Sequence, residues 1–122
     1  MEKSLYRYCQ KMHHTNSEEV IKYILKQILE GLNFLHSNHI IHRDIKSDNI
    51  LYNTSGDIKL ADFGYAAQLT KQEDLRKTRC GTVCWMAPEL IDKQPYNVKI
   101  DIWSLGIVAL ELAEGASPYV SN

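Results

Sequence analysis

Cysteine is scarce in this sequence. The 122 residues include three, Cys9, Cys80 and Cys84, and no two of them form a CxxC pair. An odd number of cysteines does not suit a disulfide scaffold, and without a CxxC pair there is no indication of a structural zinc site. Free thiols persist in reducing compartments. We therefore expect a cytoplasmic protein with neither disulfides nor structural zinc.

The sequence also lacks a charge excess and a long hydrophobic run. Its 14 basic and 15 acidic residues give a formal net charge of −1, and there is no clustered basic surface of the kind that binds nucleic acid or an anionic membrane. The most apolar segment, residues 102–113, contains Ser104 and Glu111 and is shorter than the ~20 residues of a membrane span. No apolar segment follows the charged start at Met1, so no signal peptide is recognisable. We expect neither a nucleic-acid partner nor a membrane span.

Hydrophobic periodicity predicts one domain with a mainly helical α+β fold. The predicted helices span residues 1–9, 17–36, 88–92 and 98–114, and a predicted hairpin pairs residues 50–52 with residues 58–60. Thr15 and Glu18 have the spacing of a capping box at the start of the second helix. Residues 61–87 show no sustained period, which is typical of a functional loop or of a disordered one.

The chemically informative residues form three short motifs. In chain order they are His-Arg-Asp-Ile-Lys-Ser-Asp-Asn at 42–49, Asp-Phe-Gly at 62–64 and Ala-Pro-Glu at 87–89. Each motif alone has an ordinary structural explanation, such as a surface ion pair, a cap or a tight turn. Together, their order and spacing match the catalytic loop, the metal-binding loop and the end of the activation segment of protein kinases.

The sequence thus resembles the protein kinase family, and within it the PAK-like, GTPase-activated serine/threonine kinases. The resemblance extends from residue 4 to residue 119 and is carried by HRDIKSDNIL, KLADFG, GTVCWMAPE and VKIDIWSLGIVALEL. It implies a partial kinase domain over residues 1–122, a fragment of the large C-terminal lobe with a small β-hairpin. Within this fragment the activation segment would span residues 62–89, and the core helix would be residues 98–114.

Phosphoryl transfer from ATP needs a positioned acceptor hydroxyl, a divalent metal, and cations near the developing negative charge. The resemblance assigns these tasks to particular residues. Asp44 would orient the acceptor hydroxyl or accept its proton, and Lys46 would neutralise the γ-phosphate. Asn49 and Asp62 would hold Mg²⁺ through hard oxygen ligands. Lys46 and Thr82 also imply a serine/threonine kinase, because tyrosine kinases carry a different loop and a proline at the second position.

Thr82 is expected to fix the geometry of the catalytic loop through its hydroxyl, by hydrogen bonds with Asp44 and Lys46. The alternative is a solvated turn threonine that follows Gly81. We interpret Thr82 as part of the catalytic site.

Two residues suggest regulation. Arg43 directly precedes Asp44, and in related kinases this arrangement lets the guanidinium group pair with a phosphate on the activation segment. Thr78 occupies the phosphoacceptor position of PAK-like kinases, so its phosphorylation is expected to order residues 65–87 through Arg43. The alternative is an unmodified surface threonine in a basic run. The resemblance also implies protein substrates, and a Rho-type GTPase that acts through regions outside this chain.

Other residues are expected to be structural. Asp101 resembles the buried aspartate that holds the catalytic-loop backbone in kinases, the alternative being a simple interaction with the helix dipole. His36 is expected to be solvated or to act as a cap. The expected core residues of the last helix are Trp103, Leu105, Ile107 and Val108. Because this helix is apolar nearly all round, we also expect an exposed apolar patch.

The sequence departs from the kinase pattern in two ways. Val83-Cys84 stands where the family has Pro-Tyr, which is expected to alter acceptor preference. No GxGxxG motif and no Val-Ala-Ile-Lys motif occurs, so we expect the small lobe to be absent and this chain alone to be inactive. Two hypotheses follow: a fragment of an active PAK-like kinase, or a non-catalytic kinase remnant that acts as a binding or regulatory module. The combination of catalytic and metal-binding residues favours the first.

Overall fold

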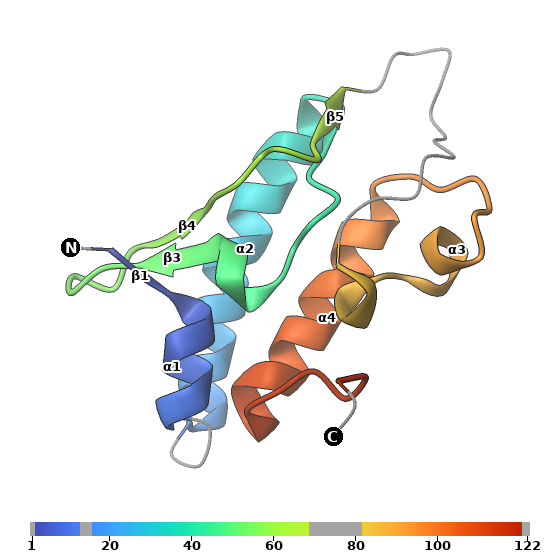
Figure 1. The fold of residues 1–122 in the computed structure, drawn as a ribbon. Coiled ribbons are helices and arrows are strands. Elements are labelled where there is room, and N and C mark those ends of the chain that lie inside the picture. The colour runs from blue at the N-terminus through green and yellow to red at the C-terminus, as the bar shows by residue number, and fades with distance from the viewer. Residues whose placement is uncertain (1, 13–15, 69–81, 121–122) are drawn as a thin grey trace.

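The computed structural model describes residues 2–12, 16–68 and 82–120. Its elements are β1 (Lys3–Ser4), α1 (Leu5–Met12), α2 (Glu18–Ser37), β2 (Ile40–Ile41), the 3-10 turn η1 (Ser47–Asn49), β3 (Ile50–Tyr52), β4 (Ile58–Leu60), β5 (Ala67–Gln68), the 3-10 turn η2 (Val83–Trp85), α3 (Pro88–Ile91) and α4 (Lys99–Glu114). The two long helices, α2 and α4, pack against each other, and α3 lies on the other side of α4 (Figure 1). The described chain is mainly helical, as the sequence predicts, and it has two small sheets, of which only the β3–β4 hairpin was predicted.

Helix α2 is amphipathic, and its buried face forms part of the main core. The buried residues recur every three to four positions: Ile24, Ile28, Leu32 and Leu35. They pack with apolar side chains of α1 and α4 in one cluster. The start of α2 differs from the prediction, because Ser17 is the N-cap and its side chain accepts the Val20 N–H at 3.3 Å. The predicted capping box is therefore wrong: Glu18 is the first helical residue, and Thr15 lies outside the described residues.

The predicted hairpin is present, and a third strand extends it. Strands β3 and β4 are antiparallel, with Ile50 opposite Leu60. Strand β1 adds to the free edge of β3, with Lys3 opposite Tyr52. The prediction of a helix from residue 1 is therefore wrong at its start, because pairing with β3 keeps Lys3–Ser4 extended and α1 begins only at Leu5.

A second sheet lies partly in the segment that shows no sequence period. Strand β2 (Ile40–Ile41) pairs antiparallel with β5 (Ala67–Gln68), and Ile41 is fully buried. Each strand has two residues, which is too short for a periodic signal. The pairing brings together the start of the 42–49 motif and the chain just after the 62–64 motif.

Helix α4 is buried on one side and exposed on the other. Its buried side includes Leu105, Ile107 and Val108, as predicted. The expected exposed patch is present, because Ile102 and Leu110 are 40% and 42% exposed. The prediction that Trp103 belongs to the core is wrong: this side chain is 38% exposed and lines open pockets beside α4. Among the described residues, no helix combines the length and apolarity needed to cross a bilayer.

Candidate active site

Asp44 is a buried carboxylate that accepts hydrogen bonds on both oxygens. It is only 6% exposed. Thr82 Oγ1 donates to Asp44 Oδ1 at 2.9 Å, and Asn49 Nδ2 donates to Asp44 Oδ2 at 3.0 Å. A buried carboxylate is costly unless its oxygens have such donors. The two bonds therefore hold the side chain of Asp44 in one orientation.

Asn49 ends the η1 turn and is also buried. Its Nδ2 donates a second hydrogen bond, to the Asp44 carbonyl oxygen at 2.9 Å, and its backbone N–H donates to Lys46 O at 2.9 Å. Its Oδ1 accepts no hydrogen bond from any residue in the described part of the chain. A buried amide oxygen left without a donor is available to a ligand, and a hard oxygen suits Mg²⁺.

His42 connects the two motifs through its ring. The Asp44 backbone N–H donates to His42 Nδ1 at 3.1 Å, and Nε2 lies 2.8 Å from Ala61 O. Because Nδ1 accepts, Nε2 must carry the ring proton and donate it to Ala61. The ring also packs against Phe63 in a tilted arrangement, with centroids 5.1 Å apart and an interplanar angle of 58°. Sequence reasoning assigned no separate task to His42, since its partners become apparent only when the two motifs are side by side.

Asp62 directly follows Ala61, and the backbone N–H of Ala61 donates a hydrogen bond to Asn49 O at 2.8 Å. This bond brings Asp62 near Asn49. Asp62 is exposed, and its φ of 53° is in the left-handed region, which is uncommon for a residue other than glycine. Its Oδ1 accepts the Gly64 N–H at 3.2 Å. A Cβ at Gly64 would lie 3.1 Å from the same oxygen, so glycine leaves space around this carboxylate.

Asp101 holds the backbone of the loop at residues 42–49 from the first turn of α4, as expected. It is 1% exposed, its Oδ2 accepts the His42 N–H at 2.9 Å, and its Oδ1 accepts the Arg43 N–H at 3.0 Å. His36 Nε2 lies 2.8 Å from Asp101 Oδ2. The prediction that His36 is solvated or a cap is therefore wrong, because the packing of α2 against α4 brings its ring to a buried carboxylate.

Lys46 follows Asp44 by two residues and has a side chain that is 20% exposed. Its Nζ lies 4.0 Å from Asp48 Oδ2. The expected hydrogen bond between Lys46 and Thr82 is absent from the described residues, and this part of the prediction is wrong. Of the two expected partners, the Thr82 hydroxyl therefore bonds Asp44, to which it donates its proton.

Arg43 reaches from the loop at residues 42–49 to two later segments. Its Nε donates to Tyr65 O at 2.5 Å, and its Nη1 donates to the Tyr96 hydroxyl at 3.0 Å. Its Nη2 has no hydrogen-bond partner in the described part of the chain. Thr78, the predicted phosphoacceptor, lies outside the described residues, so its pairing with Arg43 stays a prediction.

Sequence reasoning missed Glu111 as a member of the site. Glu111 is 1% exposed, and it accepts hydrogen bonds from Ser47 Oγ at 2.5 Å and from Trp85 Nε1 at 2.8 Å. Burial raises the pKa of Glu111, and the two hydrogen bonds oppose that rise. Glu111 thus connects the loop at residues 42–49 and the η2 turn to α4. The available signal is a single acidic side chain inside an apolar helix, which needs partners when it is buried.

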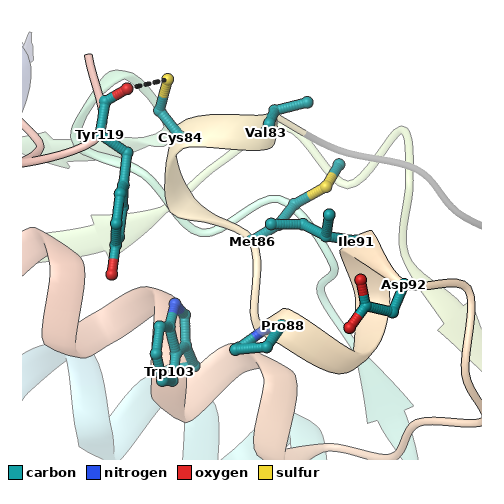
Figure 2. A pocket seen from close by; sticks show the side chains of 8 residues that line it. All are labelled: Val83, Cys84, Met86, Pro88, Ile91, Asp92, Trp103 and Tyr119. Carbon is teal, nitrogen blue, oxygen red and sulfur yellow. Dashed lines mark hydrogen bonds between the residues drawn. The ribbon is translucent and has the colours of Figure 1, made fainter. Parts of the chain in front are cut away.

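An apolar pocket of about 380 Å³ lies between η2, α3 and α4, and its lining includes Val83, the residue that follows Thr82 (Figure 2). It is lined by Val83, Cys84, Met86, Pro88, Ile91, Asp92, Trp103 and Tyr119. Figure 2 shows the Cys84 thiol directed to Tyr119 O, to which it donates at 3.5 Å. The two residues at which the sequence departs from the kinase pattern, Val83 and Cys84, therefore form part of the pocket wall.

Comparison with known proteins gives a match to the protein kinase domain over residues 1–122. The chain is 58% identical over 104 residues to the serine/threonine-protein kinase pakC of Dictyostelium discoideum, an alignment that covers 85% of this chain and 22% of that protein. It is 52% identical over 110 residues to the serine/threonine-protein kinase shk1/pak1 of Schizosaccharomyces pombe, covering 90% and 17%. It is 51% identical over 105 residues to the serine/threonine-protein kinase PAK 1 of Mus musculus, covering 86% and 19%. The chain spans about a fifth of the length of these relatives. It belongs to the protein kinase domain family, with PAK kinases among its similar relatives.

Proposed function

We propose that this chain is the catalytic part of the large lobe of a serine/threonine protein kinase, which transfers the γ-phosphate of ATP to serine or threonine hydroxyls of proteins. The observation that carries the proposal is the setting of Asp44, a buried carboxylate with Thr82 on one oxygen and Asn49 on the other. A carboxylate held in one orientation can accept a hydrogen bond from an acceptor hydroxyl and take up its proton.

Asn49 and Asp62 fit a magnesium ion that is bound together with nucleotide phosphates. Asn49 offers a buried oxygen without a described donor, and Asp62 offers a carboxylate around which Gly64 leaves space. The described residues contain no group of three or more His, Cys, Asp or Glu side chains suited to a metal ion. Such a small donor set suits Mg²⁺, which is commonly held by one or two side chains, phosphates and waters. When bound, Mg²⁺ and ATP supply the phosphoryl group and offset its charge.

Lys46 is suited to neutralise the transferred phosphoryl group. It lies in the same loop as Asp44, and its side chain is partly exposed. Its nearest carboxylate, Asp48, is 4.0 Å from Nζ, a distance at which an ion pair contributes little. The ammonium group is therefore free to pair with a phosphate oxygen, which is a stronger charge-assisted contact.

A protein acceptor would lie over the apolar pocket that begins at Val83. Thr82 bonds Asp44 and directly precedes Val83, which lines this pocket, so a side chain seated in the pocket would bring the neighbouring acceptor hydroxyl toward the carboxylate. We assign the site to protein rather than small-molecule acceptors on this basis.

Regulation would act through Arg43 and through parts of the protein outside this chain. A phosphate on Thr78 would pair with the Nη2 edge of Arg43, which has no partner among the described residues. A Rho-type GTPase would act outside these residues. Within the described residues, Cys9 and Cys84 form no disulfide, which suits a reducing, cytoplasmic setting.

The substitution Asp44→Asn in the natural protein tests this proposal, with phosphorylation of a serine peptide at saturating Mg²⁺ and ATP as the readout. Because the amide cannot accept a proton, we expect the rate to fall by about 10²- to 10⁴-fold. The matched control is Asp57→Asn, an exposed carboxylate in the hairpin turn, which should keep the wild-type rate. An unchanged rate in Asp44→Asn would refute the role of Asp44, and an inactive wild-type protein would favour the non-catalytic remnant.

A further inference from the structure

We infer that Tyr96 is a positioning residue for Arg43, and through Arg43 for the loop at residues 62–64. The inference rests on the proposed function, because that loop carries the carboxylate assigned to the metal. No role was assigned to Tyr96 from the sequence.

Tyr96 is anchored by its ring. It is 2% exposed and lies in the connection between α3 and α4. It packs in the second apolar cluster of the molecule, with Ile41, Met86, Ala87, Leu90 and Ile100. A tyrosine ring packed in this way has little rotational freedom, so the core sets the position of its hydroxyl. That hydroxyl accepts a hydrogen bond from Arg43 Nη1 at 3.0 Å.

Arg43 needs such an anchor because its side chain is long and partly exposed. Its backbone is held separately: φ is 71°, and the N–H donates to Asp101. The guanidinium group is planar, so a bond that fixes Nη1 also sets the direction of Nε. With Nη1 on Tyr96, Nε donates to Tyr65 O at 2.5 Å.

The contact with Tyr65 completes the attachment of the 62–64 loop. The loop is held at its start by Ala61, whose N–H donates to Asn49 and whose carbonyl oxygen accepts from His42. Its end is held by Tyr65, which follows Gly64 directly and whose carbonyl oxygen accepts from Arg43. The first attachment is made within the two motifs. The second depends on Tyr96, which lies far from both in the sequence.

Hydrogen exchange on the Tyr96→Phe variant of the natural protein tests the inference without reference to activity. Phenylalanine keeps the ring in the core, so the fold should persist. Loss of the bond to a charged group should accelerate exchange of the amides at residues 62–66 by about tenfold, with the hairpin at residues 50–60 unchanged. The control is Tyr23→Phe, which removes a hydrogen bond of 3.0 Å to Gly56 O and should accelerate exchange only near that turn. The inference would be overturned if the amides at residues 62–66 of the Tyr96→Phe variant exchanged at the wild-type rate, or if exchange rates rose uniformly along the chain.

A double-mutant cycle provides the kinetic test. Tyr96→Phe should raise the Mg²⁺ concentration for half-maximal phosphorylation about tenfold and leave the KM of the peptide unchanged. In an Arg43→Lys background the same substitution should have no further effect, because the two residues act as one unit. Independent, multiplying effects would contradict the inference. If exchange responds as expected while the wild-type protein transfers no phosphate, the proposed function fails and the positioning role stands.

Discussion

Thr82 and Asp44 lie 38 positions apart in the sequence and are joined by a hydrogen bond of 2.9 Å, from the threonine hydroxyl to Asp44 Oδ1. The bond connects the segment that begins the η2 turn to the loop at residues 42–49. Since the other carboxylate oxygen is held within the loop by Asn49, the orientation of Asp44 depends on both segments. The proposed general base is therefore complete only when the segment around Thr82 is in place.

Thr82→Val tests this dependence, because valine has nearly the same shape and lacks the hydroxyl. A hydrogen bond to a charged group contributes about 1.5–3 kcal/mol, so we expect kcat for peptide phosphorylation to fall about ten- to hundredfold. Thr82→Ser keeps the hydroxyl and should stay within about threefold of wild type. Steady-state kinetics of the natural protein measures both variants. Equal rates in the valine and serine variants would show that the bond does not matter.

Asp101→Asn should destabilise the fold. The carboxylate accepts two backbone N–H groups on separate oxygens, whereas an asparagine would place its NH₂ group against one of those donors. Leaving a buried donor unpaired costs about 1–3 kcal/mol, and we expect the free energy of unfolding in urea to fall by that amount. Asp57→Asn, on the exposed turn, is the matched control. A similar loss in both variants would contradict the special role of Asp101.

Glu111 should make stability depend on pH. Burial raises its pKa above the ordinary value of 4.5, so the folded protein binds this proton more tightly than the unfolded chain. Its stabilising contribution is present below about pH 4.5 and is lost as the pH rises through the folded pKa. Glu111→Gln cannot ionise. As the pH is raised from about 4 to about 8, the free energy of unfolding of the variant should therefore increase relative to that of the wild type.

Two other titratable groups, Asp48 and Cys9, interact with Glu111. Asp48 contributes to the raised pKa of Glu111, and Cys9, whose own pKa burial raises to about 12, stays protonated across the range. The control is Glu114→Gln, an exposed acid near the end of the same helix. Urea unfolding at both pH values measures the variants. The same pH trend in Glu114→Gln, or none in Glu111→Gln, would contradict the assignment.

The exposed face of α4 should cause self-association when these 122 residues are produced alone. Ile102 and Leu110 line an open apolar pocket of about 430 Å³ together with Trp103 and Tyr119. Contiguous exposed apolar surface of this kind promotes association. The double substitution of Ile102→Ser and Leu110→Ser should shift sedimentation velocity toward the monomer. Val20→Ser, an exposed position on α2, should leave it unchanged.

Local patterns predicted the elements that are long or strongly periodic. The helix predicted over 17–36 is observed at Glu18–Ser37, the helix over 98–114 is observed at Lys99–Glu114, and the hairpin strands agree with the prediction. Such elements are recognisable because their own residues define the buried face. Strand β1 and the β2–β5 pair were not predicted, because a two-residue strand exists only through its partner.

The hairpin turn also depends on a side-chain contact that the sequence does not indicate. Gln27 donates from Nε2 to Gly56 O at 3.1 Å and accepts the Ile58 N–H at 3.0 Å, so α2 holds the hairpin that connects the two motifs. Nothing distinguishes this glutamine in the sequence, because a polar residue on a helix is usually solvated. Its partners are known only once the hairpin packs on α2.

By itself, the sequence determined the chemistry of this protein: which carboxylates, amide and lysine are present, in which order, and on which local turns. Those properties depend on residue type and short-range spacing, which a sequence displays directly. The tertiary structure alone decided which groups meet: Thr82 with Asp44, His36 with Asp101, Glu111 with Ser47 and Trp85, and Tyr96 with Arg43. These contacts join residues far apart in the chain. They form only because packing of α2, α4 and the loops between them leaves buried polar groups that must find partners.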